Sequence, residues 1–313
     1  MNIVEIINRL CLLIIVSYRK NLEKNMKNIL VTGASGNVGS QVVKALRGQG
    51  QLGISAISKK AQLASFGPGE AVLFDFADQT TWEHALNNVD KVFLLRPPAI
   101  SDVKTYLFPF IDYALEKGVQ QIVFLSLQGV RFNPLTPHFK VEKYLMRKKA
   151  PYTFLRPNFF MQNLITFYKD GIAQNDEIFL PAGKGRTAFV DVRDIGAVAA
   201  EVFTGSDHIG KAYTLSGSES LDYYQVAEML TNELGRTITY QNPSVAEYVE
   251  RLRANGSPEE FIKVQKMLYF VVRHNFSSGT KSDIAKLLSR EPIAFKQFAH
   301  DYAHKWGKVT AGS

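Results

Sequence analysis

The chain has 313 residues, of which 46% are hydrophobic and 21% are charged, a composition typical of a soluble globular protein with a large core. Its single cysteine, Cys11, excludes an intramolecular disulfide and favours a reducing compartment, so we expect a cytoplasmic protein. The net charge of +8 is scattered along the chain, which favours a solvated basic surface over a nucleic-acid partner.

Residues 1–26 differ in pattern from the rest of the chain. An apolar run at 10–16 is flanked by Arg9 and Arg19, but it is shorter than the roughly 20 residues that cross a bilayer. No small-residue cleavage site comes after it. Because Met26 stands two residues before the first expected strand, we interpret 1–26 as an N-terminal extension that is not native or dispensable, with an interfacial anchor as the alternative. No stable membrane span is expected.

Strand and helix patterns then alternate through the first half. Continuously apolar runs predict strands at 28–32, 54–57, 71–74, 92–95, 122–125 and 152–155. Helical spacing is found at 37–47, 81–86, 106–117 and 139–149. Strands that are apolar throughout are buried on both faces, as in a parallel sheet covered by helices. The alternation therefore predicts an α/β fold with a doubly wound parallel sheet.

The alternation weakens after about residue 158. The pattern there predicts helices at 191–203, 222–234, 245–252 and 258–272, with a strand at 212–215. We therefore expect a core over 27–157 and a smaller, mainly helical, substrate-binding part over 158–306, interleaved with the core. Residues 307–313 are expected to be a tail.

A glycine loop joins the first strand to the first helix. Gly33 permits a tight turn, Gly36 admits a close approach of a pyrophosphate, and Gly39 lets the helix pack on the strand. The pyrophosphate then meets free N–H groups at the positive end of the helix dipole. The strand and helix lie on the correct sides of the loop, so the pattern predicts a dinucleotide-binding Rossmann fold. A glycine-rich turn without a ligand is the alternative.

The residues after the second and third strands bear on cofactor choice. An NAD-preferring site often has an acid after the second strand, but here Lys59 and Lys60 come after Ser58. Because lysines attract a 2′-phosphate, we expect NADPH to be preferred over NADH. The alternative is that both lysines are merely exposed. Asp75 either accepts from the adenine amine or caps the next helix.

Four segments make the chain similar to a known group. Residues 31–39, 93–98, 152–163 and 189–195 resemble the NmrA-like family of atypical short-chain dehydrogenases/reductases. The resemblance covers roughly residues 27 to 306. That family includes NAD(P)H-dependent quinone and triphenylmethane-dye reductases, so the resemblance implies an oxidoreductase.

The resemblance also implies roles for particular residues. It implies pyrophosphate contacts from a group in the glycine loop: Gly33, Ser35, Gly36, Asn37 and Val38. It puts Lys59 where the family often has an arginine for the 2′-phosphate. The adenosine and ribose channel is expected to be lined by a second group: Leu95, Arg96 and Pro97. The substrate pocket near the nicotinamide is expected to be lined by Phe159, Phe160 and Met161.

Ordinary short-chain dehydrogenases use a Tyr-x-x-x-Lys pair, and the string occurs here at Tyr144 and Lys148. These residues fall in the last two turns of their expected helix, so we do not expect them to be catalytic. His138 begins that helix, with Glu142 one turn later on the same face. A histidine oriented by a carboxylate can donate a proton near neutral pH. An ordinary polar helix start is the alternative for His138.

The remaining substrate contacts are expected at the ends of two strands. Ser126 and Gln128 either bind a carbonyl substrate or only finish their strand. The aromatic stretch that includes Phe159 and Phe160 suits a flat, conjugated substrate, whereas we expect Phe167 and Tyr168 to be core residues. Hydride transfer to such a substrate does not require an acid from the enzyme.

Three functions remain open from the sequence. The leading hypothesis is an NADPH-dependent reductase of a quinone-like or other conjugated small molecule, acting as a monomer or homodimer. The second is a non-catalytic NAD(P) redox sensor that binds a protein partner. The third is an isomerase or epimerase on the same fold, which the displaced Tyr-x-x-x-Lys pair disfavours. Six scattered histidines and one cysteine offer no metal-ligand cluster.

Overall fold

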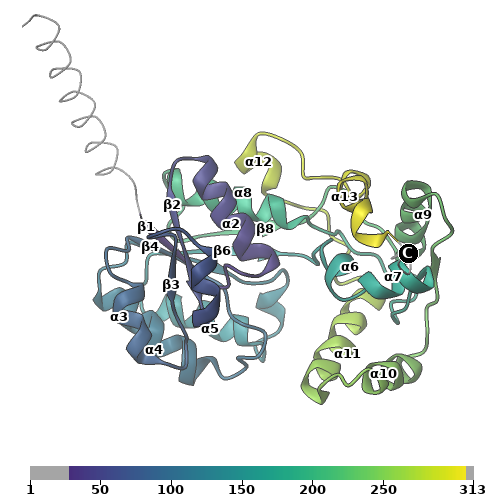
Figure 1. Cartoon of the computed structure of the whole chain (residues 1–313), viewed down its shortest axis with the longest axis horizontal. Coiled ribbons are helices and arrows are strands. Elements are labelled where there is room, and N and C mark those ends of the chain that lie inside the picture. Colours follow the sequence, from purple (N-terminus) through teal and green to yellow (C-terminus); the bar gives the residue numbers. More distant parts are fainter. Residues whose placement is uncertain (1–27, 308–313) are drawn as a thin grey trace, which may run out of the picture.

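A computed structural model describes residues 28–307. The expected extension at 1–26, and all of the expected tail except Gly307, lie outside the described residues. One sheet and three groups of buried side chains organise the chain (Figure 1).

Seven parallel strands form the main sheet, in the order β3-β2-β1-β4-β5-β6-β8. Their bounds are β1 Asn28–Val31, β2 Leu52–Ile57, β3 Ala71–Leu73, β4 Lys91–Leu94, β5 Gln121–Leu125, β6 Tyr152–Pro157 and β8 Lys211–Leu215. The chain moves outward from β1 through β2 to β3, then returns to β4 on the other side of β1. The strand order therefore reverses between β1 and β4, and ligands of such sheets bind outside the strands' carboxyl ends there.

Helices cover both faces of the sheet. One face packs against α2 (Asn37–Gly48), α8 (Val192–Thr204) and α12 (Ile284–Leu288). The other packs against α3 (Trp82–Ala85), α4 (Val103–Glu116) and α5 (Pro137–Arg147). The expected doubly wound parallel sheet is confirmed. Its seventh strand, β8, comes from beyond residue 157, so the sheet is not confined to the segment 27–157.

A second part, mainly helical, lies beside the carboxyl edge of the sheet (Figure 1). Its helices are α6 (Asn163–Thr166), α7 (Lys169–Asn175), α9 (Tyr223–Leu234), α10 (Val245–Ala254), α11 (Glu259–Arg273) and α13 (Phe295–Tyr302). A small parallel pair joins them: β7 (Glu177–Ile178) and β9 (Thr239–Tyr240). These elements share their own buried cluster.

The sequence prediction misses the shortest elements. The helices α6, α7, α12 and α13 and the strands β7 and β9 went unpredicted because a few residues show no clear period. The expected helix at 81–86 is instead the short α3, preceded by a 3-10 turn. The 3-10 turns are Lys60–Ser65, Gln79–Thr81, Val130–Phe132 and Ala303–Trp306.

The helices α2 and α8 cross in close contact. A Cβ added at Gly196 of α8 would lie 2.7 Å from the backbone carbonyl of Gln41 on α2. Real Cβ atoms do not approach backbone atoms this closely, so any side chain at Gly196 would push the two helices apart. This contact holds α8 against the helix that begins after the glycine loop.

We therefore expect Gly196→Ala to lower the free energy of unfolding by about 1–3 kcal/mol, because the added methyl overpacks the α2–α8 contact. Urea denaturation followed by circular dichroism measures the change. Gly48→Ala is the matched control, since a Cβ at Gly48 meets nothing within 4 Å. It should leave stability unchanged or raise it slightly. Equal effects of the two substitutions would show that the α2–α8 contact is not tight.

Candidate functional site

The glycine loop brings the backbone of β1 and α2 together. Gly33 adopts a φ of +68°, a conformation that favours glycine, and a Cβ there would lie 3.0 Å from the Leu95 side chain. A Cβ at Gly39 would lie 2.2 Å from the Gly33 carbonyl oxygen. The Gly36 N–H donates to that same oxygen at 3.0 Å. Glycine at 33 and 39 is therefore a steric requirement of the turn.

The first turn of α2 is free to bind an anion. Its N-cap, Gly36, provides no side-chain acceptor, and the first turn contains no acid. The first N–H groups of a helix have no intrahelical acceptor, and the helix dipole adds positive potential there. Ser35 and Asn37 are exposed beside these groups, whereas the Val38 side chain is buried, so only its backbone can reach a ligand. The loop fits a dinucleotide pyrophosphate.

The far end of the expected cofactor site lies after β2 and β3. Lys59 is exposed and is the N-cap residue of the 3-10 turn Lys60–Ser65. The Asp75 carboxylate accepts from the Ala77 N–H at 2.9 Å. The cap of the next turn is Asp78, which accepts from the Thr80 N–H at 3.0 Å. The interpretation of Asp75 as a helix cap is therefore wrong, and its role toward adenine stays a prediction.

Threonine and arginine side chains fix the loop after β4. The Leu95 N–H donates to the Thr32 hydroxyl oxygen at 2.8 Å, which ties the ends of β4 and β1 together at the switch point. Arg96 turns back onto its own loop, where Nη1 donates to three carbonyl oxygens: Pro97 at 2.8 Å, Pro98 at 3.2 Å and Ile100 at 2.6 Å. Burial lowers the pKa of Arg96. Leu95, Arg96 and Pro97 therefore form a rigid edge beside the glycine loop.

His138 lies in the first turn of α5, but its expected partner is elsewhere. Glu142 accepts two hydrogen bonds from Arg156, at 2.9 Å from Nε and 2.6 Å from Nη2. The expected orientation of His138 by Glu142 is therefore wrong, because the arginine engages both carboxylate oxygens. Burial, with a smaller effect from the nearby Arg96 charge, lowers the pKa of His138 to about 3. At neutral pH His138 is an uncharged imidazole and not a cationic acid.

The Tyr144 and Lys148 side chains have a structural partner on α4. The Tyr144 hydroxyl donates to Asp112 at 2.5 Å, and the Lys148 ammonium lies 2.8 Å from the same carboxylate. The Tyr144 ring also stacks on Phe108, with centroids 3.8 Å apart. Both side chains hold α5 on α4, away from the carboxyl edge of the sheet.

Two polar side chains at the carboxyl end of β5 lack partners. Ser126 is 4% exposed, and neither its hydroxyl nor the Gln128 Oε1 atom has a hydrogen-bond partner among the described residues. Their backbone N–H groups continue the pairing with β6, donating to the carbonyls of Leu155 and Pro157. Buried polar atoms are normally satisfied, so the pair is available to a ligand.

The expected aromatic wall is built differently from the prediction. Phe159 and Phe160 are partly buried. Met161, by contrast, is 1% exposed and belongs to the core of the C-terminal part. The expectation that Met161 lines the pocket is therefore wrong. Phe167 is 55% exposed, which contradicts the expectation of a core residue. Tyr168 is partly buried and packs against the core of the C-terminal part, and its hydroxyl bonds to those of Tyr248 and Tyr269.

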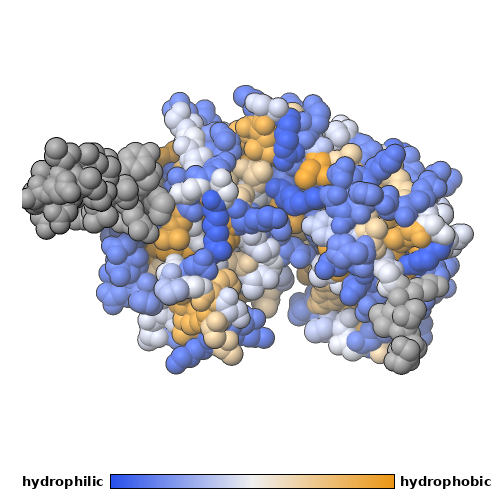
Figure 2. Space-filling view, turned by 45° about the horizontal axis from the view of Figure 1, so that its top comes forward, coloured by the Kyte–Doolittle hydropathy of each residue, from blue (hydrophilic) through white to orange (hydrophobic). Residues whose placement is uncertain are grey.

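A segment after α11, missed from the sequence, closes over this region. The Ser277 carbonyl accepts from the Asn158 side chain at 2.8 Å. A Cβ at Gly279 would lie 3.7 Å from the Gln128 amide nitrogen. Phe276 is 70% exposed. No local pattern signals this role, because the segment and the β5 and β6 ends are more than 110 residues apart in sequence. Figure 2 shows a hollow between the two parts of the molecule.

Metal-ligand clusters and membrane-spanning helices were both sought among the described residues. No group of three or more metal-ligating side chains occurs within residues 28–307. Within the same range, no helix is long and apolar enough to cross a membrane.

The fold, the glycine loop and the switch point define a Rossmann-type dinucleotide-binding protein. The NmrA-like family profile matches residues 25–299, and the chain belongs to that family. The resemblance and fold class expected from the sequence are thereby confirmed.

Similar proteins include named enzymes. An NAD(P)H azoreductase from Xenophilus azovorans is 28% identical over 289 residues, covering 89% of this chain and 99% of the relative. The prestalk A differentiation protein A of Dictyostelium discoideum is 29% identical, covering 93% and 98%. The structure of an NADPH-dependent quinone oxidoreductase from Escherichia coli, complexed with NADPH, superposes with a TM-score of 0.78 at 23% identity, covering 88% and 99%. The expectation of an NAD(P)H-dependent oxidoreductase is confirmed at the level of the family.

The low pKa of His138 predicts a pH dependence of stability. Below about pH 6.5, the ordinary pKa, the unfolded chain takes up a proton at His138 that the folded chain does not. Folding stability should therefore fall as the pH is lowered, by up to about 2 kcal/mol between pH 7 and pH 5 relative to His138→Gln. Urea denaturation of both proteins at several pH values measures the difference. Parallel pH profiles would contradict a His138 that stays neutral in the folded protein.

Proposed function

We propose that this protein is an NADPH-dependent reductase of a flat, conjugated, quinone-like small molecule, and that it works in the cytoplasm as a monomer or homodimer. The observation that carries the proposal is the pair of partnerless polar atoms, Ser126 Oγ and Gln128 Oε1. They lie at the carboxyl end of the strand next to the switch-point strand β4, on the edge where Rossmann folds bind their ligands.

The proposed cofactor site runs along this edge. The N–H groups of the first turn of α2 bind the pyrophosphate, and exposed Lys59 attracts the 2′-phosphate. The rigid edge of Leu95, Arg96 and Pro97 borders the ribose. The absence of an acid after β2 supports NADPH over NADH, since a carboxylate there would repel the additional phosphate. When bound, NADPH supplies a hydride.

The proposed substrate site combines polar and apolar groups. The Ser126 hydroxyl donates to a carbonyl oxygen of the substrate. Gln128 Oε1 accepts from a hydroxyl or carboxamide group of the bound ligand. Phe159 and Phe160 offer partly buried rings, and Phe276 offers an exposed one. These rings suit stacking against a flat conjugated molecule.

Neither His138 nor Tyr144 is a ready proton donor for the substrate. His138 is neutral, and the Tyr144 hydroxyl is engaged by Asp112. A quinone gains two electrons and a hydrogen nucleus with the hydride, and water can then protonate the product oxygen. The protein's task is therefore to orient the reactants and exclude bulk water, for which no catalytic acid is required.

Loss of NADPH absorbance with a panel of quinones and cationic dyes tests the activity. We expect turnover with at least one acceptor, and we expect Ser126→Ala to reduce kcat/KM about tenfold through loss of the substrate hydrogen bond. Tyr144→Phe is the control, because the Tyr144 hydroxyl lies on the α4–α5 interface, and its kcat/KM should be unchanged. Tight NADPH binding without turnover of any acceptor would instead favour a redox sensor.

Cofactor choice is tested at the end of β2. We expect the double substitution of Lys59 and Lys60 to alanine to raise the KM for NADPH about tenfold and to leave that for NADH nearly unchanged, because only NADPH carries a 2′-phosphate. Lys296→Ala, an exposed lysine on α13, serves as the control. Equal increases for both cofactors would remove the assignment of these lysines.

A further inference from the structure

A second cavity lies over one face of the main sheet and extends along β6 from Tyr152 to Arg156. It has a volume of about 350 Å³ and is lined by β6, the start of β8, the end of α5 and the turn Val130–Phe132. On this face α5 covers β6, and the cavity opens beside it over the edge strand β8. Small-molecule pockets range from roughly 300 to 1,000 Å³, so the cavity has room for a small ligand.

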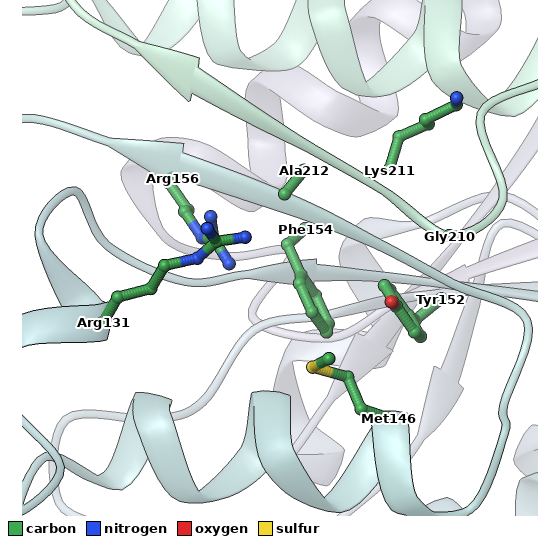
Figure 3. Close-up of a pocket in the computed structure, with 8 residues that line it drawn as sticks. All are labelled: Arg131, Met146, Tyr152, Phe154, Arg156, Gly210, Lys211 and Ala212. Carbon is green, nitrogen blue, oxygen red and sulfur yellow. The ribbon is translucent and has the colours of Figure 1, made fainter.

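Two guanidinium groups enter the cavity from different elements. Arg131 is exposed, and no ion pair or hydrogen bond of its side chain occurs within residues 28–307. Arg156 uses Nε and Nη2 to bind Glu142, which leaves Nη1 available. In Figure 3 both guanidinium groups extend to the same side of the cavity, whereas the Lys211 ammonium points away from them. The positive charge of Arg131 is therefore not paired with an acidic side chain among the described residues, and it lies beside Nη1 of Arg156.

Two aromatic rings and a thioether form much of the rest of the wall. Tyr152 and Phe154 stack with ring centroids 4.2 Å apart and planes 9° apart. Met146 of α5, which is 45% exposed, directs its thioether toward Phe154 (Figure 3). Aromatic rings and thioethers make favourable contacts with another aromatic ring. The cavity thus combines an anion-binding end with an aromatic end.

We propose that this cavity is a binding site for a small aromatic carboxylate. The carboxylate pairs with Arg131 and with Nη1 of Arg156, and the ring lies against Tyr152 and Met146. Guanidinium groups match carboxylates in geometry as well as in charge. The site does not include the glycine loop, Ser126 or Gln128, so its ligand is not the hydride acceptor and binds whether or not NADPH is present.

Isothermal titration of the full chain with 2-naphthoate tests the site, with and without saturating NADPH. We expect binding in both conditions and at least about tenfold weaker binding of the neutral 2-naphthamide, because the amide carries no charge for Arg131. Inorganic phosphate, which lacks the ring, should also bind more weakly. Absence of naphthoate binding, equal binding of the amide, or displacement by NADPH would overturn the proposal.

Variants locate the binding. Arg131→Gln should weaken naphthoate binding about tenfold. Met146→Glu puts a negative charge, the same sign as that of the carboxylate ligand, at a half-exposed position, and it should abolish naphthoate binding. This second variant keeps the test valid if Arg131→Gln folds poorly. Lys211→Gln is the matched control for general positive charge and should change binding less than about twofold. If Lys211→Gln weakened binding as much as Arg131→Gln, a diffuse surface attraction would replace the proposed site. NADPH oxidation is not needed for any of these readouts, so failure of the reductase proposal leaves the test intact.

Discussion

The Gly33 carbonyl oxygen lies where any Cβ on residue 39 would have to be, and the cofactor end of the molecule depends on that close approach. It brings the first turn of α2 against the end of β1, so the free N–H groups and the helix dipole point out of the carboxyl edge of the sheet. Thr32 adds the second restraint, since its hydroxyl oxygen accepts from the Leu95 N–H across the switch point. Together the two restraints hold the loop and the end of β4 side by side at the switch point.

The second part of the molecule is held to this edge by buried polar contacts. Asp191, fully buried at the N-cap of α8, accepts from Gln162 at 2.8 Å and pairs with Arg193. Arg193 reaches onward to Asp301 on α13, at 2.5 Å. Removing one partner of such a network leaves a buried charge unpaired, so the network resists separation of the two parts.

The chemistry of the edge differs from that of ordinary short-chain dehydrogenases. The tyrosine and lysine of the familiar string are both bound to Asp112, where they join two helices. The histidine that starts α5 is neutral because it is buried near Arg96. The groups that the proposed function uses instead are a serine hydroxyl, a glutamine carbonyl and aromatic rings, which would orient a conjugated acceptor for hydride transfer. The same helix, α5, borders the second cavity through Met146, and its Glu142 binds Arg156 of β6 on that face of the sheet.

Patterns in the sequence were enough to predict the parallel sheet and the glycine loop, because apolar runs, helical spacing and glycines act through contacts that are local in the chain. They also showed that Tyr144 lies too late in its helix to meet the edge. The partners of the polar side chains, by contrast, were decided by tertiary packing. Glu142 binds Arg156 on β6 and not His138, Met161 enters the core of the C-terminal part, and Gly279 approaches Gln128 from more than 140 residues away. Such pairings depend on the packing of distant segments, which a one-dimensional pattern does not encode.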